Sequence, residues 1–269
     1  MRRKRIRTGE LVKFVLVMLA LFLAITVTIG IGQTIWPMAQ EGITENDEEK
    51  DLIDVYAEAH GLCRSDWPEE MIALLERNPD AAEFVLNYPL KKEQSLEADL
   101  TGNIGSESTP LFLQWDERWG YTIYGSNVMG LTGCGPTCLS MVLVQLLQDA
   151  MYTPRYVADF AEKNNYYVDG SGSKWTLISE GGETLGLDVE ELPLDENCMK
   201  KVLEFGNPII CIMGPGDFTT VGHFIVLCGI EDGKFLVNDP NSTTNSGRLW
   251  SYEEISGQIK NLWVCQLPQ

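Results

Sequence analysis

Basic side chains are scarce in this sequence of 269 residues, which has 20 lysines and arginines against 39 aspartates and glutamates. A net charge of -19 repels nucleic-acid phosphates, so we expect no nucleic-acid partner. Histidine is scarcer still, with only His60 and His223, and no CxxC pair occurs. These shortages exclude the usual cysteine and histidine motifs that bind zinc, and we expect neither a metal nor a cofactor. Apolar residues make up 44% of the chain, enough for a buried core in one or two domains.

The N-terminus concentrates the basic charge that the rest of the chain lacks. Six of the 20 basic residues lie within the first 13 positions, and the 18 residues that follow, 14–31, carry no charge. As a helix this run spans roughly 27 Å, close to the hydrocarbon thickness of a bilayer. We therefore predict a cytoplasmic basic tail at 1–13 and a transmembrane helix at 14–35, a signal anchor with the acidic remainder outside the membrane.

Two other interpretations of the N-terminus are open. A cleaved signal peptide would make the protein secreted, although its apolar region normally runs only about 7 to 15 residues. A buried helix of a soluble domain is the other alternative. Both the anchor and the signal peptide export the chain, and for either one we expect an extracytoplasmic domain.

The sequence after the predicted span divides into three segments by composition. Residues 36–62 are acidic and predict a solvated stalk. Residues 63–109 form a pre-domain of two short helical patterns, each opened by a proline, followed by a polar linker. Residues 110–269 begin with a short strand or extended segment, LFLQW, and continue into an apolar helix within 133–150.

The last third of the chain is strand-like. Four short apolar runs are separated by turn residues, at 208–213, 223–230, 234–239 and 262–267. A buried helix followed by an antiparallel sheet predicts an α+β fold.

Cys134 is the first candidate for chemistry. It lies at the start of the apolar helix, where unpaired backbone N–H groups and the helix dipole favour a thiolate over a thiol. The alternatives are an ordinary turn cysteine or a disulfide with Cys138, one helical turn on, which would silence the thiol. The chain has seven cysteines, so an exported monomer keeps at least one of them unpaired.

A nucleophilic thiol needs a base, and the chain offers two histidines. His60 lies beside Glu58 in a charged helical segment and is predicted to be a surface residue. His223 opens the apolar strand FIVLCGI directly after a glycine-rich loop, so its ring is expected at a sheet end beside an open loop. His223 is therefore the candidate base, with a buried structural histidine as the alternative.

Asp239, at the end of the next strand, is the candidate that orients His223. We predict a three-residue turn with Gly233 in the left-handed conformation, which places Ile225 opposite Asp239. His223 and Asp239 then share one face, roughly 7 to 8 Å apart at the backbone. A two-residue Asp-Gly turn would shift the register and send them to opposite faces. Asn238 is the alternative orienting residue.

Gln114 is the candidate oxyanion donor. An oxyanion site needs uncharged N–H groups pointed at the carbonyl oxygen, and a glutamine amide can supply one while the backbone of Cys134 supplies another. Trp115 and Trp119 flank Gln114 closely enough to form a groove wall, although both are equally suited to a core.

The order of these motifs resembles a known family. LQWDERWGY, GCGPTCLSMVL, KWTLISEGGETLGL, GPGDFTTVGHFIVLCGI and LVNDPNS together resemble the bacteriocin-processing-like cysteine peptidases (cysteine peptidase family 39), a papain-like group, over residues 110–255. The resemblance implies a papain-like cysteine peptidase fold with Cys134 as nucleophile, His223 as base, Asp239 as its orienter and Gln114 as oxyanion-hole donor. Members in peptide exporters are fused to transport domains and cut after a double glycine in the cytoplasm. This sequence shows one predicted span and no ATPase motif, so we do not expect leader cleavage.

We therefore expect a membrane-anchored, extracytoplasmic cysteine peptidase that hydrolyses peptide bonds in a peptide or protein substrate. A cell-wall or other amide hydrolase, or an acyltransferase, could use the same residues. A non-catalytic peptide-binding module is the third possibility, in which Cys134 would react no faster than the other thiols.

Overall fold

The computed structural model describes residues 51–94 and 96–268. Tyr56–Gln269 forms one compact unit, whereas the other unit, Met1–Val55, lies almost wholly outside the described residues. The predicted basic tail, the predicted membrane span and most of the predicted stalk fall in that part. Within the described ranges, none of the helices is long and apolar enough to cross a membrane.

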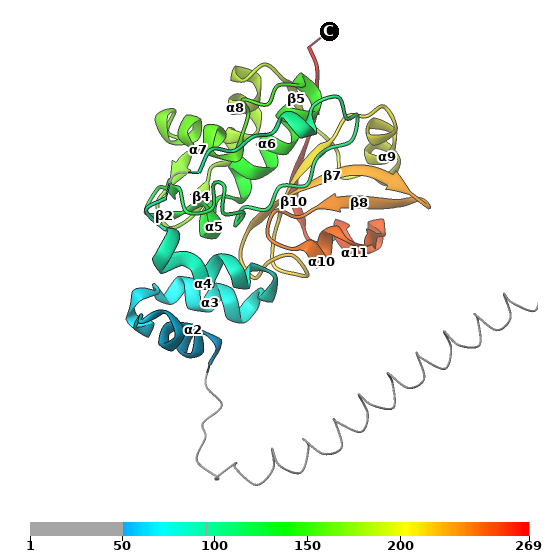
Figure 1. The fold of residues 1–269 in the computed structure, drawn as a ribbon. Coiled ribbons are helices and arrows are strands. Elements are labelled where there is room, and N and C mark those ends of the chain that lie inside the picture. The colour runs from blue at the N-terminus through cyan, green and yellow to red at the C-terminus, as the bar shows by residue number, and fades with distance from the viewer. Residues whose placement is uncertain (1–50, 95, 269) are drawn as a thin grey trace, which may run out of the picture. The chain divides into compact units, whose positions relative to one another are not determined.

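Three helices precede the family-like region of the chain (Figure 1). They are α2 (Leu52–His60), α3 (Glu69–Arg77) and α4 (Ala82–Lys91). α3 begins directly after Pro68, and Pro79 opens the 3-10 turn that leads into α4; the missing N–H of a proline would be unpaired at either start. The segment after α4 contributes to the main core, because Leu100 is fully buried there.

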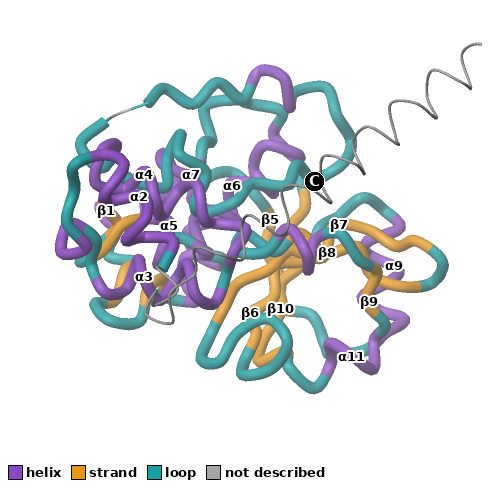
Figure 2. Tube along the Cα trace, turned by 60° about the horizontal axis from the view of Figure 1, so that its bottom comes forward, coloured by secondary structure: helices purple, strands orange, loops and turns teal. Residues whose placement is uncertain are grey.

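A six-stranded antiparallel sheet forms the centre of the α+β fold (Figure 2). Its strands are β5 (Asp188–Glu191), β6 (Ile209–Met213), β7 (His223–Glu231), β8 (Lys234–Asn238), β9 (Leu249–Trp250) and β10 (Ile259–Gln266). They lie in the order β5-β10-β6-β7-β8-β9. The four predicted runs became the four central strands, while the edge strands β5 and β9 are too short to leave a pattern in the sequence.

Alternating side chains of the central strands face two separate cores. One core contains the buried residues of α6 (Cys134–Leu147) and these residues of β6 and β7: Ile210, Ile212, Phe224 and Val226. The other contains α9 (Glu196–Glu204), α11 (Tyr252–Ser256) and these residues: Ile209, Cys211, Ile225 and Leu227. Helices thus cover both faces, and α6 is buried on every side from Gly135 to Val144, as its apolar composition predicts.

The remaining elements are short. The helices are α5 (Met129–Thr132), α7 (Pro154–Lys163), α8 (Ser179–Thr184) and α10 (Thr243–Ser246), and the two small hairpins are β1 (Ile123–Tyr124) with β2 (Asn127–Val128) and β3 (Tyr167–Val168) with β4 (Gly172–Ser173). Single 3-10 turns cover Arg64–Asp66, Pro79–Ala81, Thr101–Asn103 and Trp175–Leu177. The predicted segment LFLQW forms no strand: residues 111–113 have no regular structure, and Gln114 and Trp115 lie in a turn.

The turn between β7 and β8 differs from the predicted one. Glu231 pairs directly with Lys234, so the turn has two residues and not three. Asp232 and Gly233 occupy it with φ angles of 51° and 74°. A two-residue turn with positive φ at both positions matches the right-handed twist of the strands, and Asp-Gly is one of the pairs that prefer it. The three-residue prediction is therefore wrong.

A β-bulge in β7 nevertheless restores the predicted register at the far end of the hairpin. The pairing shifts by one residue at Cys228, which has no partner in β8. Beyond it Val226 lies opposite Asn238, the pairing that a three-residue turn would have produced. His223 and Asp239 consequently share a face, for a reason that the sequence prediction missed.

Candidate active site

Cys134 is the first residue of α6 and is partly exposed. The glycines on either side of it are required by close packing. A Cβ on Gly133 would lie 2.6 Å from the carbonyl oxygen of Met129, and one on Gly135 would lie 2.6 Å from the hydroxyl of Ser173. The Gly-Cys-Gly sequence therefore lets the chain turn tightly into the helix while the thiol stays at its open end.

Electrostatics at this position favour the thiolate. Burial alone would raise the pKa of the Cys134 thiol, but hydrogen bonding and charge interaction with His223 outweigh it. Hydrogen bonds from the backbone N–H groups of Phe224 and Gly135 act in the same direction, so the pKa lies below its ordinary value. The combination of a helix start and a neighbouring imidazolium is typical of reactive cysteines.

His223, at the first position of β7, is 6% exposed and lies between Cys134 and Asp239. Its Nε2 donates to Asp239 Oδ1 at 2.7 Å, which leaves Nδ1 for the thiol. Burial alone would lower the pKa of His223, but the charge of Asp239 and its hydrogen bond outweigh it, with a further contribution from Cys134. The pKa therefore rises to about 10.

The Asp239 carboxylate is 1% exposed and held by a polar loop. Besides His223, its Oδ1 accepts the backbone N–H of Asn241 at 2.9 Å. Its Oδ2 accepts the side-chain amide of Asn245 at 2.8 Å. Sequence reasoning missed Asn245; the only signal was the run of asparagine, serine and threonine that follows Asp239.

Gln114 lies close by and is 4% exposed. Its backbone N–H donates to the carbonyl of Pro240 at 2.7 Å, and its neighbour Trp115 donates from Nε1 to the carbonyl of Asn241 at 3.2 Å. The side-chain Nε2 donates to the carbonyl of Gly130 at 2.9 Å, whereas Oε1 is buried without a partner. One Nε2 hydrogen is thus occupied, and the second is available for an oxyanion.

Three other candidates from the sequence lie away from the thiol. Asn238 donates to the carbonyls of Thr109 and Pro110, both at 3.1 Å, and so holds the segment that leads to Gln114 instead of orienting the histidine. His60 is exposed. Trp119 is 1% exposed in the main core, which supports the core interpretation for this residue.

Cys138 is fully buried in the core, and burial raises the pKa of its thiol well above the ordinary value. Residues four apart on a helix have Cβ atoms roughly 5 to 6 Å apart, whereas a disulfide needs roughly 3.5 to 4.5 Å. A Cys134–Cys138 bond would therefore require the start of α6 to distort. All seven cysteines are free in the structure.

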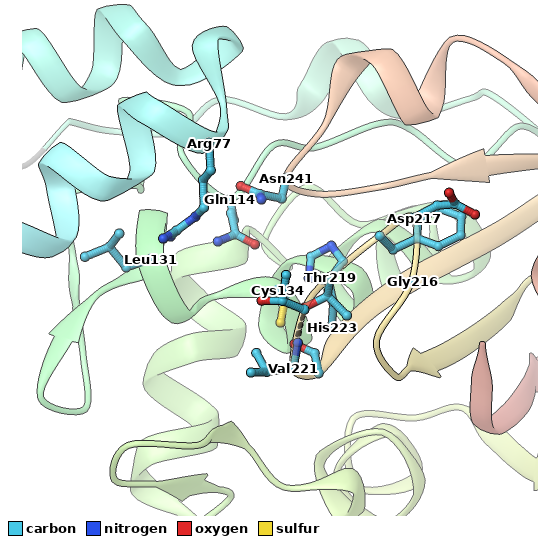
Figure 3. Close-up of a pocket in the computed structure, with 13 residues that line it drawn as sticks. Arg77, Gln114, Leu131, Cys134, Gly216, Asp217, Thr219, Val221, His223 and Asn241 are labelled. Atoms are coloured by element: carbon cyan, nitrogen blue, oxygen red, sulfur yellow. Dashed lines mark hydrogen bonds between the residues drawn. The ribbon is translucent and has the colours of Figure 1, made fainter.

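Two cavities meet at the thiol. One of about 420 Å³ is lined by Gln114 and the loop before β7 (Figure 3), and the other, of about 440 Å³, is lined by Trp175 and β6. Both share Cys134 and the segment 221–223. The cleft therefore continues on two sides of the thiol, which suits a chain-like ligand that crosses it. No group of metal-ligating side chains occurs in the described part of the chain.

A thiol at a helix start, a buried histidine and a buried carboxylate are the groups that thiol-dependent hydrolases use. The family comparison agrees, since the Peptidase_C39 like family matches residues 107–265, more than half of the chain. The chain belongs to this family.

Similar solved structures include the peptidase domain of Streptococcus ComA, a bifunctional ABC transporter involved in a quorum-sensing pathway. It is 19% identical with a TM-score of 0.41, covering 51% of this chain and 93% of that one. A C39-like peptidase from Bacillus anthracis is 15% identical with a TM-score of 0.39, covering 62% of this chain and 98% of that one. No curated protein matches the chain at a significant level.

Proposed function

We propose that the protein is a papain-like cysteine peptidase that hydrolyses peptide bonds through Cys134, His223 and Asp239, with Gln114 as oxyanion donor. The observation that carries the proposal is the continuous series of contacts from the thiol through His223 to the Asp239 carboxylate. The basic tail and uncharged run of the N-terminus support display outside the membrane on a single anchor.

In the resting enzyme the proton of Cys134 resides on His223, because the pKa of the thiol is lowered and that of the imidazole is raised. The thiolate attacks the substrate carbonyl, and the negative oxygen is held by Gln114 and a backbone N–H at the start of α6. His223 then donates its proton to the leaving amine as the C–N bond breaks. Water, losing a proton to His223, attacks the acyl-enzyme and releases the acid and the thiol.

Thiol reactivity provides the first test. We expect iodoacetamide to label Cys134 of the purified full-length protein rapidly at acidic pH, because the ion pair keeps the sulfur ionised below the ordinary thiol range of about pH 8.5. Rates would be measured by mass spectrometry from pH 4 to 9, with the six other cysteines as internal controls. Labelling of this site should vanish in Cys134→Ala and slow in His223→Ala.

If the labelling rate of Cys134 rises only near pH 8.5, as for an ordinary thiol, the result would contradict the ion pair and favour a binding module. Fast labelling combined with no cleavage in a broad peptide library would support an activated thiol but not a peptidase. In that case cell-wall amides and acyl-transfer substrates would be tested with the same variants.

A further inference from the structure

The cavity beside Gln114 has a wall that lies outside the family-matched region. Arg77, the last residue of α3, lines this cavity together with Cys134 and His223, although the family match begins only at residue 107. Figure 3 shows the Arg77 side chain extending from α3 toward the side of the cavity where Gln114 and Leu131 lie. The helical pre-domain thus supplies one of the residues that any bound substrate would meet.

The end of α3 is fastened to the loop that carries the catalytic carboxylate. Asn78, directly after Arg77, is 8% exposed and donates from Nδ2 to the carbonyl of Asn241 at 2.5 Å. The carboxylate of Asp80 accepts a hydrogen bond from the Thr243 hydroxyl. These contacts hold the backbone beside Arg77 in place. The side chain of Arg77 therefore starts from a fixed point at the edge of the cavity.

A second set of contacts joins α4 to the segment that follows Gln114. Lys91 pairs with Glu117 at 2.5 Å, and the ring of Phe84 stacks on that of Tyr121 with centroids 4.5 Å apart. The Tyr121 hydroxyl also donates to the Phe84 carbonyl at 2.9 Å. The pre-domain is therefore packed against the domain that carries the site.

The guanidinium of Arg77 is exposed and, among the described residues, has neither an ion pair nor a hydrogen bond. The acidic group that lines the same cavity, Asp217, accepts a hydrogen bond from the Gln258 amide at 2.7 Å. The other charges form one series, in which the imidazolium of His223 lies between the thiolate of Cys134 and the carboxylate of Asp239. An unpaired cation in a cleft attracts an anionic group of the ligand, and guanidinium matches a carboxylate in particular.

We infer that Arg77 is a specificity-determining residue that binds a carboxylate of the substrate close to the scissile bond. The carboxylate could belong to an acidic side chain or to the C-terminus of a short peptide. This inference rests on the proposed peptidase function for its biological meaning, but binding of a carboxylate beside Cys134 can be measured without turnover.

A purely structural role makes a different prediction. A cation in the last turn of a helix also stabilises the helix dipole. If that were the whole role of Arg77, its removal would lower the melting temperature without changing the preference between charged and neutral ligands.

The experiment compares two thiol-reactive probes of equal shape on the full-length protein, the α-amides of bromoacetyl-glutamate and bromoacetyl-glutamine, which differ only in the charge of the side chain. We expect Cys134 to react about tenfold faster with the glutamate probe, as a partly exposed charge-assisted hydrogen bond allows. Arg77→Gln should remove the difference between the two probes, and Arg77→Glu should reverse it. Lys92→Gln, which removes one exposed charge of the pre-domain away from the cavity, is the matched control.

Equal glutamate preference in the wild type and Arg77→Gln would overturn the inference, as would no preference in the wild type. Peptide pairs with a glutamate or glutamine at each position near the cut, and with a free or amidated C-terminus, distinguish the two sources of carboxylate. If Cys134 prefers the glutamate probe but no peptide is cleaved, the proposed peptidase function fails while the carboxylate site stands. If peptides are cleaved equally well with glutamate or glutamine near the cut, the peptidase function stands while the carboxylate site fails.

Discussion

Three hydrogen-bond donors converge on the Asp239 carboxylate: the His223 ring, the backbone N–H of Asn241 and the Asn245 amide. These donors satisfy the carboxylate oxygens in a buried setting, and the imidazole that Asp239 holds is fixed with Nδ1 toward the thiol. The buried charge also accounts for the raised pKa of His223.

Asp239→Asn tests this electrostatic role, because it keeps the shape and removes the charge. The negative charge raises the pKa of His223, so its loss lowers that pKa and moves the alkaline limb of the kcat/KM profile to lower pH by about one unit or more. The measurement is the pH dependence of peptide cleavage, or of Cys134 labelling if no peptide is known.

Asn238→Ala is the control for that variant. It removes hydrogen bonds to two backbone carbonyls and should lower the free energy of unfolding by about 1 to 3 kcal/mol. Its alkaline limb should stay in place. An Asp239→Asn profile that coincides with the wild type would refute a charge effect on His223.

At the scale of elements, the β7–β8 hairpin decides whether the base and its partner meet. The two-residue turn alone would place His223 and Asp239 on opposite faces, and the bulge at Cys228 corrects this by one residue. The thiol of Cys228 also lies 3.5 Å from the carbonyl oxygen of Leu236 and 3.6 Å from Oδ1 of Asn238, and the side chain packs against the main core.

Single-residue deletions in β7 test the bulge. Deleting Cys228 removes the residue without a partner and should leave every strand pair in place, so fast acidic labelling of Cys134 should persist. Ile225 lies only three positions away but is paired with β6. Deleting Ile225 shifts His223 by one residue relative to β6 and β8, and should abolish the fast labelling of Cys134. Circular dichroism and melting curves would accompany the labelling. Loss of reactivity in both, with folding intact, would show that the bulge has a role beyond register.

At the scale of the whole molecule, the charge distribution is the basis for the proposed location outside the membrane. The basic tail of 1–13 precedes an uncharged run, and the rest of the chain is strongly acidic. We predict that protease added to intact cells digests the folded domain, because positive residues remain on the cytoplasmic side. Replacing Arg2, Arg3, Lys4, Arg5 and Arg7 with glutamine should reduce this accessibility. Domain protected in intact cells and digested only after lysis would disprove the predicted orientation.

The helical pre-domain also belongs to this larger scale. Its two predicted helices follow Pro68 and the 3-10 turn opened by Pro79, as local sequence signals indicate. That Asn78 would hold the loop after Asp239, and that Arg77 would reach the cavity, could not be predicted from a chain separation of some 160 residues. Such contacts depend on how two surfaces that are distant in the chain pack together, which leaves no periodic trace in the sequence.

The sequence alone identified the four central strands, the buried helix and the four candidate residues of the site, because these depend on apolar periodicity, helix-start chemistry and the scarcity of histidine. The actual turn, the bulge that corrects it and the support from Asn245 came only with the tertiary structure. Strand register and side-chain convergence are decided by packing between distant segments, so a local pattern cannot fix them. The clearest example is that Arg77 and Cys134 line the same cavity, because no local sequence signal near either residue predicts this.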